Sequence, residues 1–197
     1  MSTEEDLHQY LLETTRFKHR LGLTLPKNYH YLGGEDYVLD RGSLFQSQAL
    51  TKAERTAILD ALQSCSVKRF QMGHCFYNTQ MLIGFSAPDT FQYCEGWAIG
   101  FVGLPTLHAW LIINGKIFDP TWRTERPTYR GKLSTRIWGT FPETWAYYGA
   151  IFHTAEVVSR LSRIKVTGSF LDDIAFGFPL FQEPRLRSLS DILNRNQ

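Results

Sequence analysis

Apolar side chains recur every three or four positions over residues 3–21, which predicts an amphipathic helix. The recurring positions are Leu7, Tyr10, Leu11, Thr14, Phe17 and Leu21. A capping pair, either Ser2 with Glu5 or Thr3 with Asp6, is suited to begin this helix.

Two further segments show the same helical period. Thr51 with Glu54 forms a second capping pair before the apolar stripe Ala53, Ala57, Ile58, Ala61, Leu62 and Cys65. Since Cys65 falls on that stripe, we expect it to be a core residue. His153 and Thr154 are placed to cap another helix that runs to about residue 164.

The clearest β pattern lies in "HAWLIINGKIFD", residues 108–119. Two apolar runs flank Asn114-Gly115, the strongest short signal for a two-residue hairpin. The aromatic and β-branched residues of 91–102 predict another strand. The sequence therefore predicts an antiparallel sheet in the middle of the chain.

The remaining segments carry weaker patterns. Residues 27–50 have turn signals and no clear period, so we expect a loop-rich connection with short strands. Phe141-Pro142-Glu143 indicates a helix start before the aromatic residues of 145–148, and residues 170–184 favour a strand or loop. No repeat or linker is visible, so we predict a single α+β domain over residues 1–197.

Composition narrows the possible functions. The 197 residues are 43% hydrophobic and 14% aromatic, with a formal net charge of +2. Such a chain is globular and lacks the basic excess typical of nucleic-acid binding. No secretory segment or membrane-length apolar run is present, so we expect a cytoplasmic protein with no membrane partner. We expect Arg185-Leu186-Arg187, the densest basic group, to lie in a solvated tail.

The three cysteines have no regular spacing, and no CxxC or HxxxH pair exists. We therefore expect free thiols, no metal site and no cofactor. Cys75 differs from the others because it follows Gly73 at a predicted loop-to-helix junction, with Cys75, Thr79 and Ile83 on one helix face. The positive end of a helix dipole favours a thiolate there, which makes Cys75 a candidate nucleophile.

The hairpin supplies partners for such a thiolate. A two-residue turn at Asn114-Gly115 pairs position 108 with position 121, so His108 and Asp119 lie on one face of the sheet. A histidine base oriented by a carboxylate is what thiol acyl chemistry needs. Each residue alone also fits a structural role, as a satisfied core histidine or a turn aspartate.

Other polar residues near these positions have plainer interpretations. His74 precedes the candidate nucleophile and is expected to be a surface or capping residue, because neighbouring positions on a helix point apart. Cys94 is expected in the core. Glu95 is a charge within an apolar strand, and we favour a solvent-facing position over one bordering the site.

Three segments resemble the transglutaminase-like superfamily. "HAWLIINGKIFDPTW" is similar to its His-Asp strands, "GHCFYNTQ" to its nucleophile helix, and "YCEGWAIG" to the strand before the histidine. The resemblance covers about residues 67–123. It implies a papain-like core in which Cys75 is the nucleophile, His108 the base and Asp119 the orienting carboxylate.

The resemblance also implies acyl transfer at an amide of a protein, peptide or small molecule, with water or an amine as acceptor. The Cys75 N–H would stabilise the oxyanion, joined by Gln71, which is equally compatible with a loop role. Tyr93 and Trp110 are candidates for the site wall, although aromatic residues on a sheet more often belong to the core.

Two other functions stay open. A papain-like fold without catalysis could serve as a binding or inhibitory module, since a fold alone does not fix a function. A redox-sensing thiol is a third hypothesis, for which Cys94 is the only nearby candidate for the resolving cysteine that Cys75 would need. The complete Cys-His-Asp set favours the enzyme.

Overall fold

The computed structural model describes residues 2–65, 70–124, 136–164, 167–173 and 177–194. Its helices are α1 (Thr3–Arg20), α2 (Gly34–Arg41), α3 (Lys52–Ser64), α4 (Cys75–Phe85), α5 (Thr154–Ile164), the 3-10 turn η2 (Pro179–Gln182) and α6 (Leu189–Asn194). Its strands are β1 (Ser43–Phe45), β2 (Gln92–Ile99), β3 (Pro105–Ile113), β4 (Lys116–Arg123), β5 (Arg136–Trp138) and β6 (Ala146–Phe152). The α+β class is thereby confirmed.

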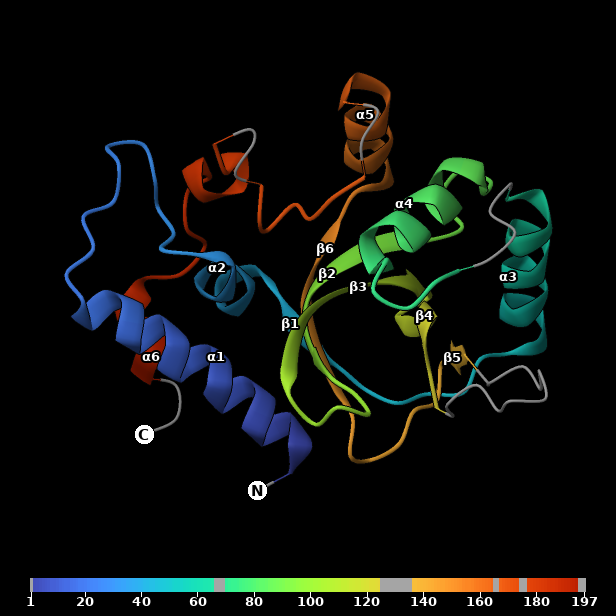
Figure 1. Cartoon of the computed structure of the whole chain (residues 1–197), viewed down its shortest axis with the longest axis horizontal. Helices are drawn as coiled ribbons and strands as arrows, with labels where there is room; N and C mark the ends of the chain where they lie inside the picture. Colours follow the sequence, from blue (N-terminus) through green and yellow to red (C-terminus); the bar gives the residue numbers. More distant parts are fainter. Residues whose placement is uncertain (1, 66–69, 125–135, 165–166, 174–176, 195–197) are drawn as a thin grey trace.

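The strands form one antiparallel sheet in the order β1-β6-β2-β3-β4-β5. The last strand of the described chain, β6, lies between β1 and β2, next to the edge strand β1 (Figure 1). Every strand contributes to one inner cluster, which contains Phe45, Cys94, Ala98, Trp110, Ile112, Ile117, Ile137 and Tyr147. The sheet therefore curls around this cluster.

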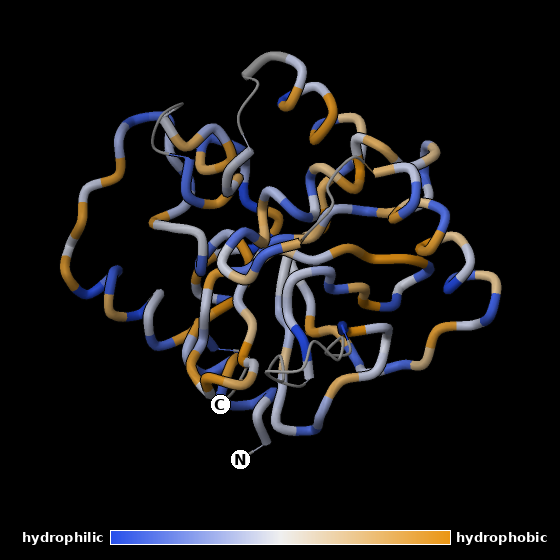
Figure 2. Tube along the Cα trace, turned by 45° about the vertical axis from the view of Figure 1, so that its right-hand side comes forward, coloured by the Kyte–Doolittle hydropathy of each residue, from blue (hydrophilic) through white to orange (hydrophobic). Residues whose placement is uncertain are grey.

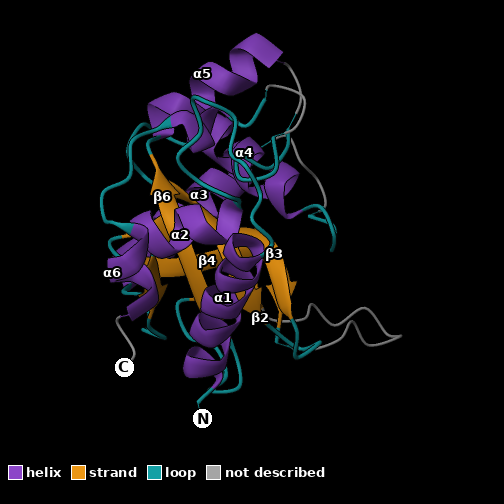
Figure 3. Ribbon diagram, turned by 90° about the vertical axis from the view of Figure 1, so that its left-hand side faces the viewer, coloured by secondary structure: helices purple, strands orange, loops and turns teal. Residues whose placement is uncertain are grey.

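The helices cover the other face of the sheet. Leu7 and Leu11 of α1 and Leu82 of α4 belong to one large cluster with Tyr93 and Leu111 of the strands. Figure 3 shows α1 and α2 in front of the sheet, and Figure 2 shows apolar segments running through the centre of the molecule. Helix α4 packs on β2, β3 and β4, which brings its first residue, Cys75, to the sheet.

The predicted helices over residues 3–21, 51–65, 74–84 and 154–164 are confirmed. Complete capping boxes begin two of them, with Ser2 and Glu5 at α1 and Thr51 and Glu54 at α3. Cys65 is buried, as its place on the apolar stripe predicts.

The helix predicted to start at Phe141 is wrong. Residues 146–152 form β6, which pairs with β2 from Ala146 to Phe152 and with β1 through Tyr147, Tyr148 and Gly149. The aromatic residues there alternate between the two faces, with Tyr147 in the inner cluster and Tyr148 packed on the helix side. Strand pairing on both edges thus outweighs the helix-start signal of the preceding proline.

Residues 27–50 contain one short strand, β1, as expected, and a helix, α2, that the pattern did not reveal. Helix α2 has only eight residues, and all of Gly34–Asp40 is buried. A helix buried on every side shows no polar stripe, so its sequence lacks the amphipathic period.

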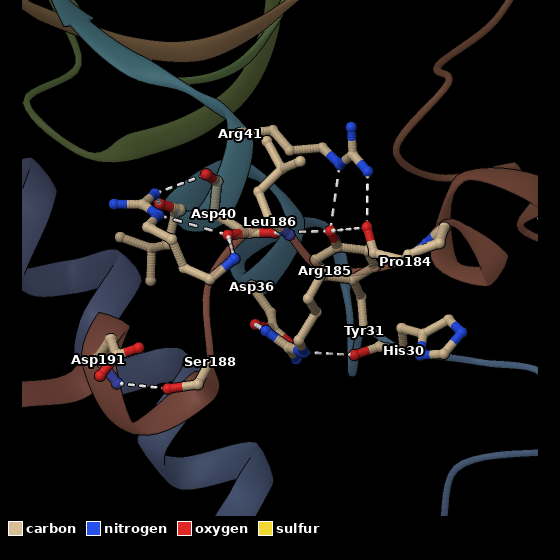
Figure 4. Close-up of polar contacts among 12 residues, drawn as sticks. His30, Tyr31, Asp36, Asp40, Arg41, Pro184, Arg185, Leu186, Ser188 and Asp191 are labelled. Carbon is tan, nitrogen blue, oxygen red and sulfur yellow. Dashed lines mark hydrogen bonds and ion pairs between the residues drawn. The ribbon is translucent and has the colours of Figure 1, made fainter.

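The C-terminal segment is clamped to α2, so the expected solvated tail at Arg185-Leu186-Arg187 is wrong. Arg185 donates through both terminal nitrogens to Asp36, and the backbone N–H groups of Leu186 and Arg187 donate to Asp40 at 2.8 and 2.9 Å (Figure 4). Both carboxylates are buried, and a buried charge needs a partner of opposite charge. Arg185 and Arg187 supply these partners.

The preceding segment, residues 170–184, has no strand in its described portion, and residues 174–176 lie outside the described residues. Among the helices that the structure describes, none has the length and apolar character needed to cross a membrane.

Candidate active site

Cys75 is the first residue of α4, where the backbone N–H groups of the first turn have no partner within the helix. Gly73 enters this turn with a φ of 82°, a left-handed conformation that favours glycine. His74 is the N-cap residue, exposed and without a side-chain capping bond, in agreement with its expected surface position. The Cys75 side chain is buried, with 7% of its surface exposed.

The hairpin forms with the expected register. Asn114 and Gly115 have φ values of 50° and 77°, as a type I′ turn requires. β3 and β4 pair from Ile113 with Lys116 to Leu111 with Phe118. His108 and Asp119 lie beyond this paired stretch, and His108 Nε2 is 2.7 Å from Asp119 Oδ2.

Asp119 is fully buried and accepts further hydrogen bonds that fix its orientation. Its Oδ1 accepts from the N–H groups of Thr121 and Trp122 at 2.8 and 3.0 Å. Its Oδ2 accepts from the Tyr147 hydroxyl at 3.1 Å. These donors hold the carboxylate against the imidazole of His108.

The pKa of His108 is raised to about 9. Burial lowers this pKa, but the charge and hydrogen bond of Asp119 and a hydrogen bond with Cys75 outweigh it. Because Nε2 faces Asp119, the other ring nitrogen, Nδ1, is left for the thiol. The imidazolium is therefore the main form of His108 at neutral pH.

Trp122 covers the imidazole of His108. The two rings stack with centroids 4.1 Å apart and planes 15° from parallel. Trp122 is itself packed edge-on against Trp145, and a Cβ at Gly100 would approach Trp122 within 2.5 Å. The absence of a side chain at Gly100 thus leaves room for the ring that caps the histidine.

Asn78 joins α4 to the segments on either side of it. Its Nδ2 donates at 2.9 Å both to the Gln71 carbonyl, before Cys75, and to Thr121 Oγ1, after Asp119. Gln71 is exposed, and its backbone takes part in this contact. Asn78 therefore fixes the cysteine-bearing turn relative to the strand that carries the aspartate.

Tyr93 and Trp110, the two candidates for the site wall, are both fully buried. Trp110 lies in the inner cluster with its ring centroid 6.1 Å from that of His108. Tyr93 accepts from Gln80 of α4 at 3.1 Å and donates to Glu95 at 2.8 Å. Both rings therefore belong to the core of the protein.

Glu95 is fully buried, so the expected solvent-facing position is wrong. Its carboxylate accepts from the N–H groups of Phe170 and Leu171 at 2.8 and 3.0 Å, and from Ser169 and Tyr93. Burial raises the pKa of Glu95, while these donors act in the opposite direction. Glu95 anchors the chain after α5 to the sheet.

Sequence reasoning missed three residues of this arrangement: Asn78, Trp122 and Tyr147. Asn78 had a weak signal, because it is an amide one helical turn after Cys75 in a largely apolar helix. Trp122 follows Asp119 by three residues, so a turn at the aspartate places Trp122 near the Asp119 carboxylate. Tyr147 had no usable signal, since its segment was predicted as a helix.

The triad has little exposed surface. His108 is 2% exposed and Asp119 is fully buried. A cavity of about 720 Å³ lies between the end of α1, α2 and the strands β2 and β3, and Leu107, not His108, contributes to its lining. No His, Cys, Asp and Glu of the described ranges gather in a set of three able to hold a metal ion.

Comparison of the chain with protein-family models, with curated proteins and with solved structures finds no match. The functional argument therefore depends on the geometry of the residues themselves.

Proposed function

We propose that the protein catalyses cysteine-dependent acyl transfer at an amide, with Cys75 as nucleophile, His108 as acid and base, and Asp119 as the orienting carboxylate. The core in this proposal is papain-like, with a nucleophile at the start of a helix that packs on an antiparallel sheet. The substrate is a protein, a peptide or a small amide.

One observation carries the proposal. A buried imidazole is held at 2.7 Å by a buried carboxylate, and Cys75, at the N-terminus of α4, is among the groups that raise the pKa of this imidazole. The three side chains come from α4, β3 and β4, so only the folded chain brings them together. A core that needed only packing would not require this alignment of ionisable groups.

The first step starts from the imidazolium of His108. The Cys75 thiolate attacks the amide carbonyl carbon, and the N–H groups at the start of α4 stabilise the oxyanion that forms. The C–N bond breaks as His108 donates its proton to the leaving nitrogen. The acyl group is now bonded to the sulfur of Cys75.

The second step returns the enzyme to its starting state. Neutral His108 takes a proton from water or from an amine, which attacks the thioester carbon and releases the Cys75 thiolate. Water gives hydrolysis or deamidation, and an amine gives transamidation. Asp119 keeps the imidazole in the orientation needed for both steps.

The burial of the triad favours a second candidate, a papain-like module that binds without catalysis. Cys75 is only 7% exposed, and the lining of the 720 Å³ cavity includes none of the three residues. A redox function has less support, because Cys94 is fully buried and burial raises the pKa of its thiol, which disfavours a reactive partner for Cys75.

The acyl-transfer proposal is tested with p-nitrophenyl acetate, a small activated acyl donor, followed by acid quenching and mass spectrometry. We expect one acetyl group, located on Cys75, in the wild type. The His108→Ala variant should acylate at least about a hundredfold more slowly, because general acid–base catalysis contributes that much.

Iodoacetamide labelling across a pH series separates the two candidates. Fast alkylation of Cys75 at acidic pH, lost in His108→Ala, reports the thiolate–imidazolium pair. Labelling of this kind without acetyl transfer supports the binding module. Equal and slow labelling of Cys65, Cys75 and Cys94 contradicts the triad itself.

A further inference from the structure

A second pocket lies at the opposite edge of the sheet from α1, between α3 and β5. It has a volume of about 480 Å³, within the range of small-molecule sites. Its lining consists of Arg55, Leu59, Thr124, Arg136, Trp138 and Thr140. Two arginines, two threonines and one tryptophan thus line one space.

Within the described residues, the two arginines of this pocket have no carboxylate partner. Neither Arg55 nor Arg136 forms an ion pair with an Asp or Glu in the described ranges, where the arginines at positions 16, 41, 160, 185 and 187 all do. Arg136 also lies opposite Arg123 in the β4–β5 register. Like charges placed opposite each other on a sheet repel.

Arg136 is half-buried and lies against an aromatic ring. Its guanidinium lies over the Phe70 ring, 5.0 Å from the ring centroid. Burial and the charge of Arg123 lower the pKa of Arg136. The charged form of Arg136 is therefore less stable here than it would be in water. The side chain therefore pays a desolvation cost that an anionic ligand would offset.

The aromatic and apolar part of the lining limits the kind of anion. Trp138 packs against the helix-side core and is half-buried, and Leu59 of α3 is 50% exposed. A bare inorganic ion would use only the arginines. An organic anion with a planar or apolar body would use both parts of the pocket.

We propose that this pocket binds an organic oxyanion, a carboxylate or a phosphate ester, with Arg55 and Arg136 on the oxyanion and Trp138 and Leu59 on the organic body. This site is independent of the acyl-transfer proposal. Phe70, under Arg136, begins the described segment that leads to Cys75.

The test is isothermal titration calorimetry with benzoate, phenyl phosphate, inorganic phosphate and benzamide, all with the full chain. We expect benzoate or phenyl phosphate to bind more tightly than inorganic phosphate, and neutral benzamide not to bind measurably. The anion with the lower Kd identifies the group that the pocket prefers.

Variants assign the binding to the pocket. Arg136→Gln should raise the Kd of the preferred anion about tenfold or more, the usual effect of losing a charged hydrogen bond. Arg55→Gln should raise it several-fold, and because Arg55 is exposed this variant is expected to fold even if Arg136→Gln does not. Arg20→Gln, an exposed residue of α1 with the same change in charge, is the control.

Equal Kd values for Arg55→Gln, Arg136→Gln and Arg20→Gln overturn the proposal, as would benzamide binding as tightly as benzoate. Absence of binding by all four probes to the wild type also overturns it. Neither result bears on acylation of Cys75, so the two proposals fail separately.

Discussion

Asp119 and Glu95 show how this fold buries carboxylates at the scale of single residues. Each accepts hydrogen bonds from two backbone N–H groups and from a tyrosine hydroxyl. Asp119 differs because it also contacts an imidazole, whereas the partners of Glu95 among the described residues are all neutral. The first arrangement creates an ion pair, and the second ties a loop to the sheet.

The ion pair predicts a pH dependence of stability. The pKa of His108 is raised from 6.5 to about 9, so its contribution is complete below pH 6.5 and is lost as the pH rises through about 9. The loss amounts to about 3 kcal/mol at most. Urea unfolding at about pH 6 and about pH 10 should show this fall in the wild type and a clearly smaller one in His108→Gln.

Glu95→Gln should destabilise the protein by about 2 kcal/mol. The new NH₂ group cannot accept from Phe170 or Leu171, so one buried backbone N–H is left unsatisfied. The measurement is the free energy of unfolding in urea, and the control is Glu143→Gln, an exposed position that should change it by less than about 0.5 kcal/mol. Equal effects of the two changes would remove the anchoring role of Glu95.

The part of the site that the sequence predicts is the part set by local geometry. A two-residue turn fixes which residues of the hairpin share a face, so the pairing of His108 with Asp119 follows from Asn114-Gly115 alone. Tyr147 reaches Asp119 through contacts distant along the chain, which no local period encodes. The solvent-facing position predicted for Glu95 is wrong for the same reason, since its backbone N–H donors, Phe170 and Leu171, lie about 75 residues further on.

At the scale of elements, the β3–β4 hairpin sets the register on which the site depends. Gly115 occupies the left-handed region with a φ of 77°, and a Cβ there would meet nothing within 4 Å. Any effect of a side chain at this position is therefore conformational and not steric.

Gly115→Ala should lower the free energy of unfolding by about 1 kcal/mol, the strain of an alanine in this conformation. Gly168→Ala is the matched control, because its Cβ also meets nothing and its φ lies outside the left-handed region. We expect that control to be neutral or slightly stabilising in urea unfolding. A Gly115→Ala variant as stable as the control would contradict the type I′ turn.

The elements that could not be predicted from the sequence are those that are buried on all of their faces. Helix α2 is buried on all sides and β6 packs on both faces, so neither shows the one-sided pattern from which elements are inferred. The amphipathic helices α1 and α3, each with a capping box, were predicted within a residue or two.

At the scale of the whole molecule, the C-terminal segment ties back to the region after α1. Arg185 donates to Asp36 and to the carbonyl of His30, and its guanidinium lies 4.7 Å from the centroid of the Tyr31 ring. Helix α6 then packs Ile192 into the helix-side core. The two ends of the described chain are thereby part of one folded unit.

Asp36→Asn should destabilise the protein by about 3 kcal/mol, because it leaves the guanidinium of Arg185 without its buried partner. Glu13→Gln breaks the exposed pair with Arg16 and should cost less than about 1 kcal/mol. Urea unfolding measures both, and limited trypsin digestion should cleave the Asp36→Asn variant near its C-terminus first. Similar stability of the two variants would show that the clamp contributes little.

The position of β6 has a consequence for how the protein is made. When a ribosome has released residues 43–123, β2 already has β3 beside it, but its other edge is open and β1 has no neighbour at all, since both await β6. The nascent chain therefore carries an unpaired apolar strand until translation has passed residue 152. Slow synthesis between β4 and β6 would prolong this state, when capture by a chaperone, or pairing with another nascent chain, competes with folding.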